Sequence, residues 1–480
     1  SMTYEKYFPS EYFNANASNT VTMKNIGTSS PKYYNGIDVI YTGRVSGSSS
    51  DEYFYSECLP GFNCRLNLQN ATGKMLFDIT DPVNVRYTVL TSDQCIVVPE
   101  YKNSYLLFSG IYKTPVSMNV FDNTYTSSLH SRTVNKDMVI ITHGDFYDFF
   151  RDDNIGNEYI SAHLQYDNGV NSIAVVSMDS ISCEFGRGYQ EPAATRNFIR
   201  YAHENWGTEY FLLAGDGNYY IRPEMSYTEK NYIYPADPYN PYNSGAGSDD
   251  FYGELYSDAT AQHISLGRLP VSSLTELRNV VSKTTSFINN SEIDGQRAKI
   301  LLVGDDERSL NGDGTWGETL HIINTETKIL PTIPGYYFSD KLYMTEYPFE
   351  YSSATGLFLK PRAEQDLIRK MNGEVNFICY VGHGAPMQLA HEKLFTPSSY
   401  SYVNNYNKYF FMFGATCSFG VFSVPDIKYL SEQMLISQGK GTVGAINSVT
   451  AVYTGSNESL VRDFLNSAFS DEMNKLTIGK

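Results

Sequence analysis

Residues 375–384 read VNFICYVGHG, and residues 409–420 read YFFMFGATCSFG. Each segment is an apolar run of strand length that ends on a reactive side chain: His383 between two glycines in the first, and Cys417 after Gly-Ala-Thr in the second. The carboxyl ends of parallel strands meet at one edge of an open α/β sheet, and ligands bind there. We therefore predict that His383 and Cys417 lie at neighbouring strand ends.

Apolar runs alternate with helical stretches from about residue 136 onward. Runs that are apolar almost throughout are typical of parallel strands covered by helices on both faces. The sequence therefore predicts a mostly parallel α/β domain in two subdomains, residues 136–290 and 291–480, the second of which carries His383 and Cys417. The predicted strands are residues 137–142, 172–178, 209–215, 264–269, 299–304, 375–381, 409–415 and 442–446. The predicted helices are residues 191–206, 274–288, 426–437 and 457–469.

Residues 1–135 have a different pattern. Short runs that alternate polar and apolar residues are separated by Gly, Pro, Asn and Asp, which is typical of strands joined by turns. We predict an all-β, sandwich-like N-terminal domain. The runs on which this rests are residues 38–45, 73–79, 85–91 and 104–110.

The composition limits the classes of function. The chain of 480 residues has a formal net charge of −17, and nucleic-acid binding needs a basic surface, so nucleic acid is excluded as a partner. No apolar run approaches the roughly 20 residues that span a bilayer. The six cysteines are too few for a disulfide scaffold, although Cys58 and Cys64 are close enough in sequence to pair if the chain is exported. The N-terminal Ser1-Met2 suggests that a targeting segment has been removed.

The residues at the strand ends match the needs of a cysteine peptidase. Such an enzyme requires a thiolate, a histidine that moves a proton, and N–H donors for the oxyanion. Cys417 and His383 are the candidates for the first two, and the main-chain N–H groups of Gly384 and Cys417 for the third. Asp305 and Asp306, at the end of another predicted strand, are candidates to orient the imidazole.

A structural role remains the alternative for each of these residues. A single histidine and a single cysteine separated by 34 positions are weak signals when taken one at a time. His143 also ends an apolar run and precedes a glycine, but no cysteine-bearing strand accompanies it, so we interpret it as structural.

The acidic loops have two interpretations. Asp216, Asp249 and Asp250 offer the oxygen ligands that calcium takes in proteins, and they are equally typical of turns, which is the interpretation we favour. A nucleotide site is excluded because the chain has neither GxGxxG nor a P-loop lysine.

These motifs resemble those of the gingipain family of cysteine peptidases, within the caspase-like clan. The chain looks most like the PorU-type sortases of the type IX secretion system in Bacteroidota. The resemblance runs from about residue 70 to the end. It rests on YVGHG and ATCSF together with LFDITDPVNV (76–85), SCEFGRG (182–188), YFLLAGDG (210–217), SDDFYGEL (248–255), SLGRLPV (265–271) and LLVGDDE (301–307).

The resemblance implies a chemistry and a site. It implies a caspase-like fold, a Cys417 nucleophile, His383 as proton donor and acceptor, and no cofactor required for catalysis. An acidic residue after the strand at 299–304 is expected to contact His383, and it matches Asp305 or Asp306. The substrate pocket is expected to include the segment Trp316-Gly317-Glu318.

The resemblance also implies substrates and a location. The expected substrate is an exported cargo protein, cut near its C-terminal sorting domain through an acyl-enzyme at Cys417, with a lipopolysaccharide amine as an alternative acceptor to water. Other outer-membrane proteins of the secretion machinery are expected partners, and the outer-membrane surface or the extracellular space is the expected location. The chain is also expected to continue beyond residue 480 in the full protein.

One residue and one segment depart from the sortase pattern. Ser418 stands where an acidic residue usually follows the nucleophile, and residues 421–426 (VFSVPD) are less acidic than the family pattern. An alternative hypothesis is therefore a catalytically silent peptidase-like module that binds or supports the secretion machinery.

Overall fold

The computed structural model describes two compact units, residues 1–121 and 122–480, which we treat separately. The described residues are 45–47, 51–57, 64–81, 84–97, 102–110, 129–130, 134–166, 169–218, 229–236, 247–256, 262–290, 295, 298–306 and 320–469.

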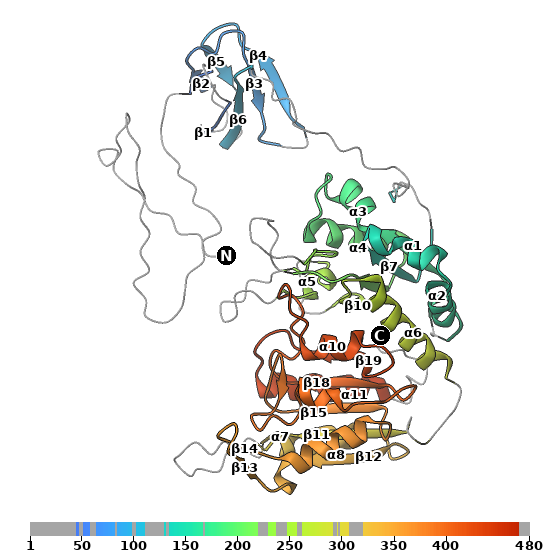
Figure 1. Cartoon of the computed structure of the whole chain (residues 1–480). Helices are drawn as coiled ribbons and strands as arrows, with labels where there is room; N and C mark the ends of the chain where they lie inside the picture. Colours follow the sequence, from blue (N-terminus) through green and yellow to red (C-terminus); the bar gives the residue numbers. More distant parts are fainter. Residues whose placement is uncertain are drawn as a thin grey trace. The chain divides into compact units, whose positions relative to one another are not determined.

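The described part of the first unit consists of antiparallel β-structure (Figure 1). A four-stranded sheet has the order β1-β6-β3-β4, and β2 pairs with β5. Alternate residues such as Leu76, Tyr105 and Leu107 form its small core, which explains the period-two pattern in the sequence. The strands are β1 (Glu52–Glu57), β2 (Cys64–Asn67), β3 (Met75–Asp78), β4 (Arg86–Val89), β5 (Gln94–Val97) and β6 (Lys102–Phe108).

The second unit begins with a four-stranded parallel sheet of order β10-β9-β7-β8. Every residue of β7 is buried, because helices cover both faces. Helices α3 and α4 pack on one face, and α1, α2 and α6 pack on the other. The elements are β7 (Met138–Thr142), α1 (Gly144–Asp152), α2 (Asn154–Tyr166), β8 (Ile173–Ser177), α3 (Met178–Phe185), α4 (Pro192–Trp206), β9 (Tyr210–Ala214), α5 (Asp250–Gly253), β10 (Ser265–Leu269) and α6 (Leu274–Asn289).

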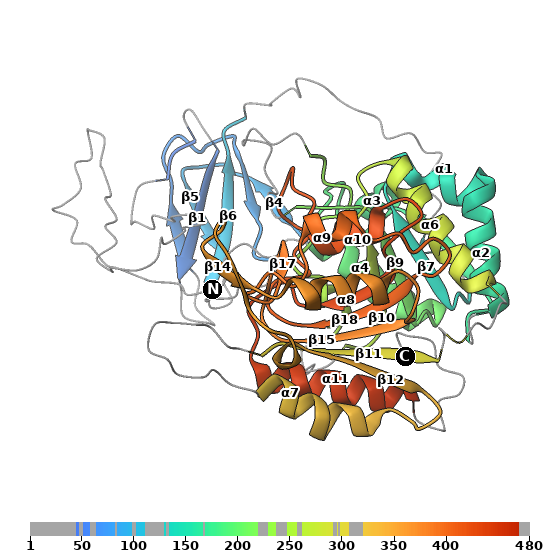
Figure 2. The ribbon, with the colours of Figure 1, turned by 60° about the horizontal axis from the view of Figure 1, so that its bottom comes forward.

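A five-stranded parallel sheet follows, with the order β12-β11-β15-β18-β19. Helices α8, α9 and α10 cover one face, and α11 with the helical segment from α7 covers the other (Figure 2). The strands are β11 (Lys299–Gly304), β12 (Phe338–Tyr343), β15 (Phe377–Val381), β18 (Phe410–Ala415) and β19 (Thr442–Asn447). The helices are α7 (Leu320–Asn324), η3 (Thr325–Ile329), η4 (Leu330–Thr332), η5 (Met344–Glu346), α8 (Pro361–Met371), α9 (Pro397–Ser401), α10 (Leu430–Ile436) and α11 (Thr454–Phe469). Two hairpins complete it, β13 (Glu350–Ser352) with β14 (Leu357–Leu359) and β16 (Gly384–Ala385) with β17 (Gln388–Leu389).

Helix α6 joins the two sheets through a buried lysine. Lys283 Nζ donates to the main-chain oxygens of Met434, Lys440 and Thr442, at 3.1, 2.9 and 3.0 Å. Three carbonyl acceptors match the three N–H donors of an ammonium group. Helix α6, which packs on the four-stranded parallel sheet (here the first sheet), is therefore bonded to α10 and to β19 of the five-stranded sheet (the second sheet).

The eight predicted strands of the second unit are all present, and their parallel pairing confirms the predicted fold class. The predicted helix over residues 426–437 begins later, at Leu430, because the preceding residues bond to other parts of the unit, as described below. The subdomain limits that we predicted at residues 135 and 290 stay predictions. Cys58 lies outside the described residues, so the proposed pair with Cys64 also stays a prediction. Within the described segments, every helix is too short or too polar to cross a bilayer.

Candidate active site

The register of β15 and β18 brings the loops that carry His383 and Cys417 out of the sheet at the same level. Val381 pairs with Ala415 in the parallel ladder, and each reactive residue follows its paired residue by two positions. The Gly382 N–H donates to Ala415 O at 3.4 Å, so the two chains are still bonded as they leave the sheet. Neighbouring parallel strands lie about 4.8 Å apart, and the two loops therefore share one site at the carboxyl edge.

The two glycines around His383 make room for neighbouring side chains. A Cβ atom on Gly382 would lie 2.3 Å from Asp305 Cβ, and one on Gly384 would lie 2.3 Å from Thr416 Oγ1. Real Cβ atoms do not approach so closely, so any larger residue would push the loop away. The Gly-His-Gly sequence thus lets the His383 loop lie directly against both Asp305 and the loop that carries Cys417.

Asp305 holds the main chain of His383. Its Oδ2 atom accepts the His383 N–H at 2.9 Å, and its Oδ1 atom accepts the Asp306 N–H at 2.9 Å. The hydroxyl of Tyr380 donates to His383 O at 2.5 Å, so the peptide groups on both sides of His383 are fixed. Burial raises the pKa of the Asp305 carboxyl, while the His383 N–H bond and the His383 charge oppose that rise.

Asp306 faces a different partner. Its Oδ2 atom forms a buried ion pair with Lys360, which also donates to Met344 O and lies 4.2 Å from the centre of the Phe349 ring. Asp305, Asp306 and the buried Glu392 have carboxylate oxygens within 4.8 Å of one another, the one such group among the described residues. The Lys360 ammonium supplies a cation to this group, and a metal site there stays untested.

Two further histidines border His383. The His321 ring, on α7, lies 5.5 Å from the His383 ring between centroids, in an edge-to-face arrangement, and the exposed His391 ring lies at 4.5 Å. Burial lowers the pKa of His321 to about 4, and the charge of His383 adds to that effect. His321 is therefore neutral near pH 7 and is an uncharged neighbour of the His383 ring.

The thiol of Cys417 contacts the loop that follows β19. The Val452 N–H donates to Cys417 Sγ at 3.4 Å, and Sγ lies 3.7 Å from Val452 O. The next residue, Ser418, has the left-handed φ of 53° and donates its N–H to Thr450 O at 2.9 Å. A left-handed non-glycine residue costs roughly 1–2 kcal/mol, and this bond helps to hold it.

The comparisons with known proteins agree with this geometry. The model of peptidase family C25 matches residues 131–480. The chain belongs to peptidase family C25. It is a gingipain-family cysteine peptidase with the family's α/β fold.

The C25 chain resembles solved gingipain structures. The Arg-specific cysteine proteinase gingipain R (RgpB) superimposes with a TM-score of 0.54 and 18% identity, over 73% of this chain and 71% of that one. A chain from the complex of the Porphyromonas gingivalis RgpB pro- and mature domains gives a TM-score of 0.50 and 18% identity, over 69% and 68%. At this identity the likeness shows the fold alone. No curated protein shows significant similarity to the chain.

In the C25 chain, the segment after the cysteine loop is bound to the first sheet. The guanidinium group of Arg268 pairs with Asp249 through two bonds of 2.6 and 2.7 Å and lies 5.0 Å from the centre of the Phe422 ring. The Gly247 N–H donates to Ser423 Oγ at 2.9 Å. Arg268 of SLGRLPV, paired with Asp249 of SDDFYGEL, therefore contacts Phe422, and Gly247, just before SDDFYGEL, bonds Ser423, a short distance beyond Cys417.

Asp216 belongs to a second ionic cluster between the sheets. Its carboxylate pairs with Lys428 and accepts the Ser272 hydroxyl at 3.1 Å, while Glu229 and Glu432 lie 3.4 and 3.6 Å from Lys428 Nζ. Burial raises the pKa of Glu432 to about 9, and the charge of Asp216 adds to this rise. Asp216 and Asp249 thus each have a cationic partner from the chain itself, and a calcium role for the acidic loops stays a prediction.

The remaining predicted residues divide into two groups. Trp316, Gly317 and Glu318 lie outside the described residues, so the substrate pocket stays a prediction. His143 caps α1, because its Nδ1 atom accepts the Asp145 N–H at 3.0 Å. Lys360, His321 and Val452 were not anticipated: each is far in sequence from the residue it contacts, and no motif marks it.

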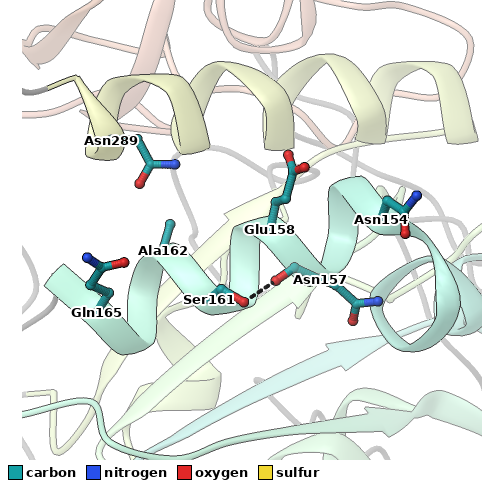
Figure 3. A pocket seen from close by; sticks show the side chains of 7 residues that line it. All are labelled: Asn154, Asn157, Glu158, Ser161, Ala162, Gln165 and Asn289. Carbon is teal, nitrogen blue, oxygen red and sulfur yellow. Dashed lines mark hydrogen bonds between the residues drawn. The ribbon is translucent and has the colours of Figure 1, made fainter.

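The C25 chain also has an open hollow of about 390 Å³ between α2 and the end of α6 (Figure 3). Amide side chains dominate its lining, and none of the predicted site residues belongs to it. The hollow is therefore separate from the candidate active site. Its lining residues are Asn154, Asn157, Glu158, Ser161, Ala162, Gln165 and Asn289.

Proposed function

We propose that this C25 chain cleaves peptide bonds through an acyl-enzyme at Cys417. The observation that supports this most strongly is the equal offset of His383 and Cys417 from the paired residues Val381 and Ala415. In this mechanism the Cys417 thiolate attacks the scissile carbonyl carbon, and the His383 imidazolium gives a proton to the departing amine.

The hairpin after His383 supports the proposed oxyanion site. The Ala390 N–H donates to His383 O at 2.9 Å, and Gly384 pairs with Leu389 in the antiparallel ladder. Hydrogen bonds alternate in such a pair, so the Gly384 N–H points away from Leu389. We assign this N–H, with that of Cys417, to the oxyanion of the tetrahedral intermediate.

Asp305 has a positioning role in this proposal. It holds the main chain of His383 at 2.9 Å, whereas Asp306 is engaged by Lys360. A carboxylate that fixes the loop keeps the imidazole in place without itself exchanging protons.

The proposed substrate is an exported cargo protein with a C-terminal sorting domain. The support is the motif resemblance to type IX secretion sortases, and with it come the proposed location at the cell surface and partners in the outer membrane. An amine on lipopolysaccharide then attacks the acyl-enzyme carbonyl, the C–S bond breaks, and the thiolate is regenerated. Hydrolysis shares the same first step and differs in the acceptor alone.

Labelling by a thiol-directed peptide inhibitor tests the nucleophile. We expect wild-type chain to be labelled at Cys417, Cys417→Ala to remain unlabelled there, and His383→Ala to lose about 10²–10⁴-fold in turnover. His143→Ala is the matched control, because His143 also ends a strand before a glycine yet caps α1, and it should retain labelling. Labelling at another cysteine, or no turnover of any peptide, would favour the silent-module alternative.

Product analysis tests the acceptor. A model substrate that ends in a sorting domain is incubated with and without a simple primary amine, and the new C-terminus is read by mass spectrometry. An amide adduct that grows with amine concentration supports the sortase proposal. Free carboxylate as the sole product at every amine concentration would identify a hydrolase.

A further inference from the structure

The Cys417 thiol has one hydrogen-bonding neighbour that catalysis by Cys417 and His383 does not account for. Val452 lies 35 residues further along the chain, after the edge strand β19. Its N–H donates to Sγ at 3.4 Å, and its carbonyl oxygen lies 3.7 Å from Sγ. One residue thus offers the sulfur both a donor and an acceptor.

The two partners suit two states of the sulfur. A neutral thiol donates its S–H to the carbonyl oxygen of Val452. A thiolate has no hydrogen to donate, and it accepts the N–H instead. A hydrogen bond to a charged acceptor is stronger than one to a neutral acceptor, so the N–H favours the thiolate.

The loop that presents Val452 is held in place before any substrate arrives. The Ser418 N–H donates to Thr450 O, and the Gly420 N–H donates to Ser448 O, both at 2.9 Å. The Ser448 hydroxyl closes the loop with a 2.8 Å bond to Thr450 O. The loops after β18 and β19 are therefore bonded to each other next to the contact with sulfur, through residues that follow Cys417 and precede Val452.

Helix α11 begins directly after this loop. The Asn457 N–H donates to Tyr453 O at 3.1 Å, so the first helical bond starts one residue after Val452. The helix then runs for 16 residues to Phe469. The N-terminus of a helix carries a partial positive charge, which stabilises a nearby thiolate.

We infer that the main-chain N–H of Val452, two residues before α11 begins, activates Cys417 by stabilising its thiolate. On ionisation the S–H proton passes to a base in solvent, and the sulfur keeps its electron pair and the N–H bond. His383 then remains available to protonate the departing amine. This inference rests on the proposed nucleophilic role of Cys417, and it names the group that prepares that nucleophile.

The test measures the rate at which iodoacetamide alkylates Cys417 at pH 7, followed at the Cys417 peptide by mass spectrometry. Val452→Pro removes the N–H, and Val452→Ala retains it as the matched control. We expect alkylation to be about tenfold slower in Val452→Pro and to keep the wild-type rate in Val452→Ala. Equal rates for the proline variant and wild type would overturn the inference.

A second measurement needs no proline in the loop. In ¹⁵N-valine-labelled wild type, the Val452 amide resonance, assigned through its loss in Val452→Ala, should lie downfield of its position in Cys417→Ala, which has no sulfur to accept the N–H. A Val452 resonance at the same position in both proteins contradicts the inference even if Val452→Pro fails to fold.

The two proposals fail in different ways. Alkylation requires no peptide substrate, so slower alkylation of Val452→Pro in a chain that cleaves nothing would reject the peptidase proposal and support the contact with Val452. Normal peptide cleavage with an unchanged alkylation rate in Val452→Pro would reject the role of Val452 alone.

Discussion

Replacing Gly384 by alanine tests whether the His383 loop is held against the Cys417 loop. The added Cβ would lie 2.3 Å from Thr416 Oγ1 and 2.9 Å from Thr416 Cγ2. Thr416 is buried, and its hydroxyl has no hydrogen-bond partner in the described structure. The methyl group therefore meets a buried side chain at less than contact distance, and one of the two loops must move.

The expected cost follows from the packing. Inserting a methyl group into a packed site costs about 1–3 kcal/mol in free energy of unfolding. Thr416→Ala removes both clashing atoms. Loss of the buried methyl group should lower the free energy of unfolding by about 1 kcal/mol, and loss of the unpaired hydroxyl should change it little. In the double variant the new Cβ meets only the Cβ at position 416, at 3.2 Å, so we expect the double variant to be about 1–2 kcal/mol more stable than the sum of the single effects predicts.

Urea unfolding followed by tryptophan fluorescence measures this coupling. Both tryptophans, Trp206 and Trp316, belong to the second unit, so the signal reports the unit that holds the site. Gly455→Ala is the control, because a Cβ there meets nothing within 4 Å. Additive effects of Gly384→Ala and Thr416→Ala would refute the direct contact between the two loops.

Two further predictions concern the buried charges behind His383. Lys360→Met leaves the Asp306 carboxylate buried without its cation and should destabilise the chain by about 3–5 kcal/mol, whereas Lys360→Met with Asp306→Asn should recover most of that loss in the same urea assay. Burial raises the pKa of Glu392 to about 7 from its usual 4.5. Between these two values the folded chain keeps a proton that the unfolded chain releases. The free energy of unfolding should therefore fall as the pH rises from 4.5 through 7. Glu392→Gln cannot ionise and should flatten this fall, which urea midpoints at pH 5 and pH 8 will show; an equal fall in both proteins would exclude Glu392 as its source.

The strands of the second unit were predictable because their burial is uniform. Each of the five residues of β7 and of β15 is buried, and such strands appear in a sequence as unbroken apolar runs. The pairing of β15 with β18 was predictable from a second signal, because both apolar runs end in short polar loops. What the sequence could not provide was the register, which determines that His383 and Cys417 leave the sheet at the same level.

The contacts around the site were less predictable. Lys360 pairs with Asp306, which lies 54 positions away in the sequence. Lys360 directly precedes a helix that begins with proline, and nothing in the local sequence distinguishes it from an exposed lysine. The start of α10 was wrong by four residues, because Lys428 turns to Asp216 and the Asp426 N–H donates to Glu229 before the helix can begin. Contacts between distant segments decide both cases, and local periodicity carries no information about them.

The role of the first sheet follows from these same contacts. It contributes neither His383 nor Cys417, yet its motifs are among the most recognisable in the chain. Arg268 explains this: its side chain donates to Gly215 O and Ile233 O, pairs with Asp249, and stacks on Phe422. Residues that follow Cys417 are thereby fixed to a rigid sheet, and a nucleophile on a loop needs such support to hold its geometry. The first sheet thus supports the cysteine loop, and its recognisable motifs contain the residues that make these supporting contacts.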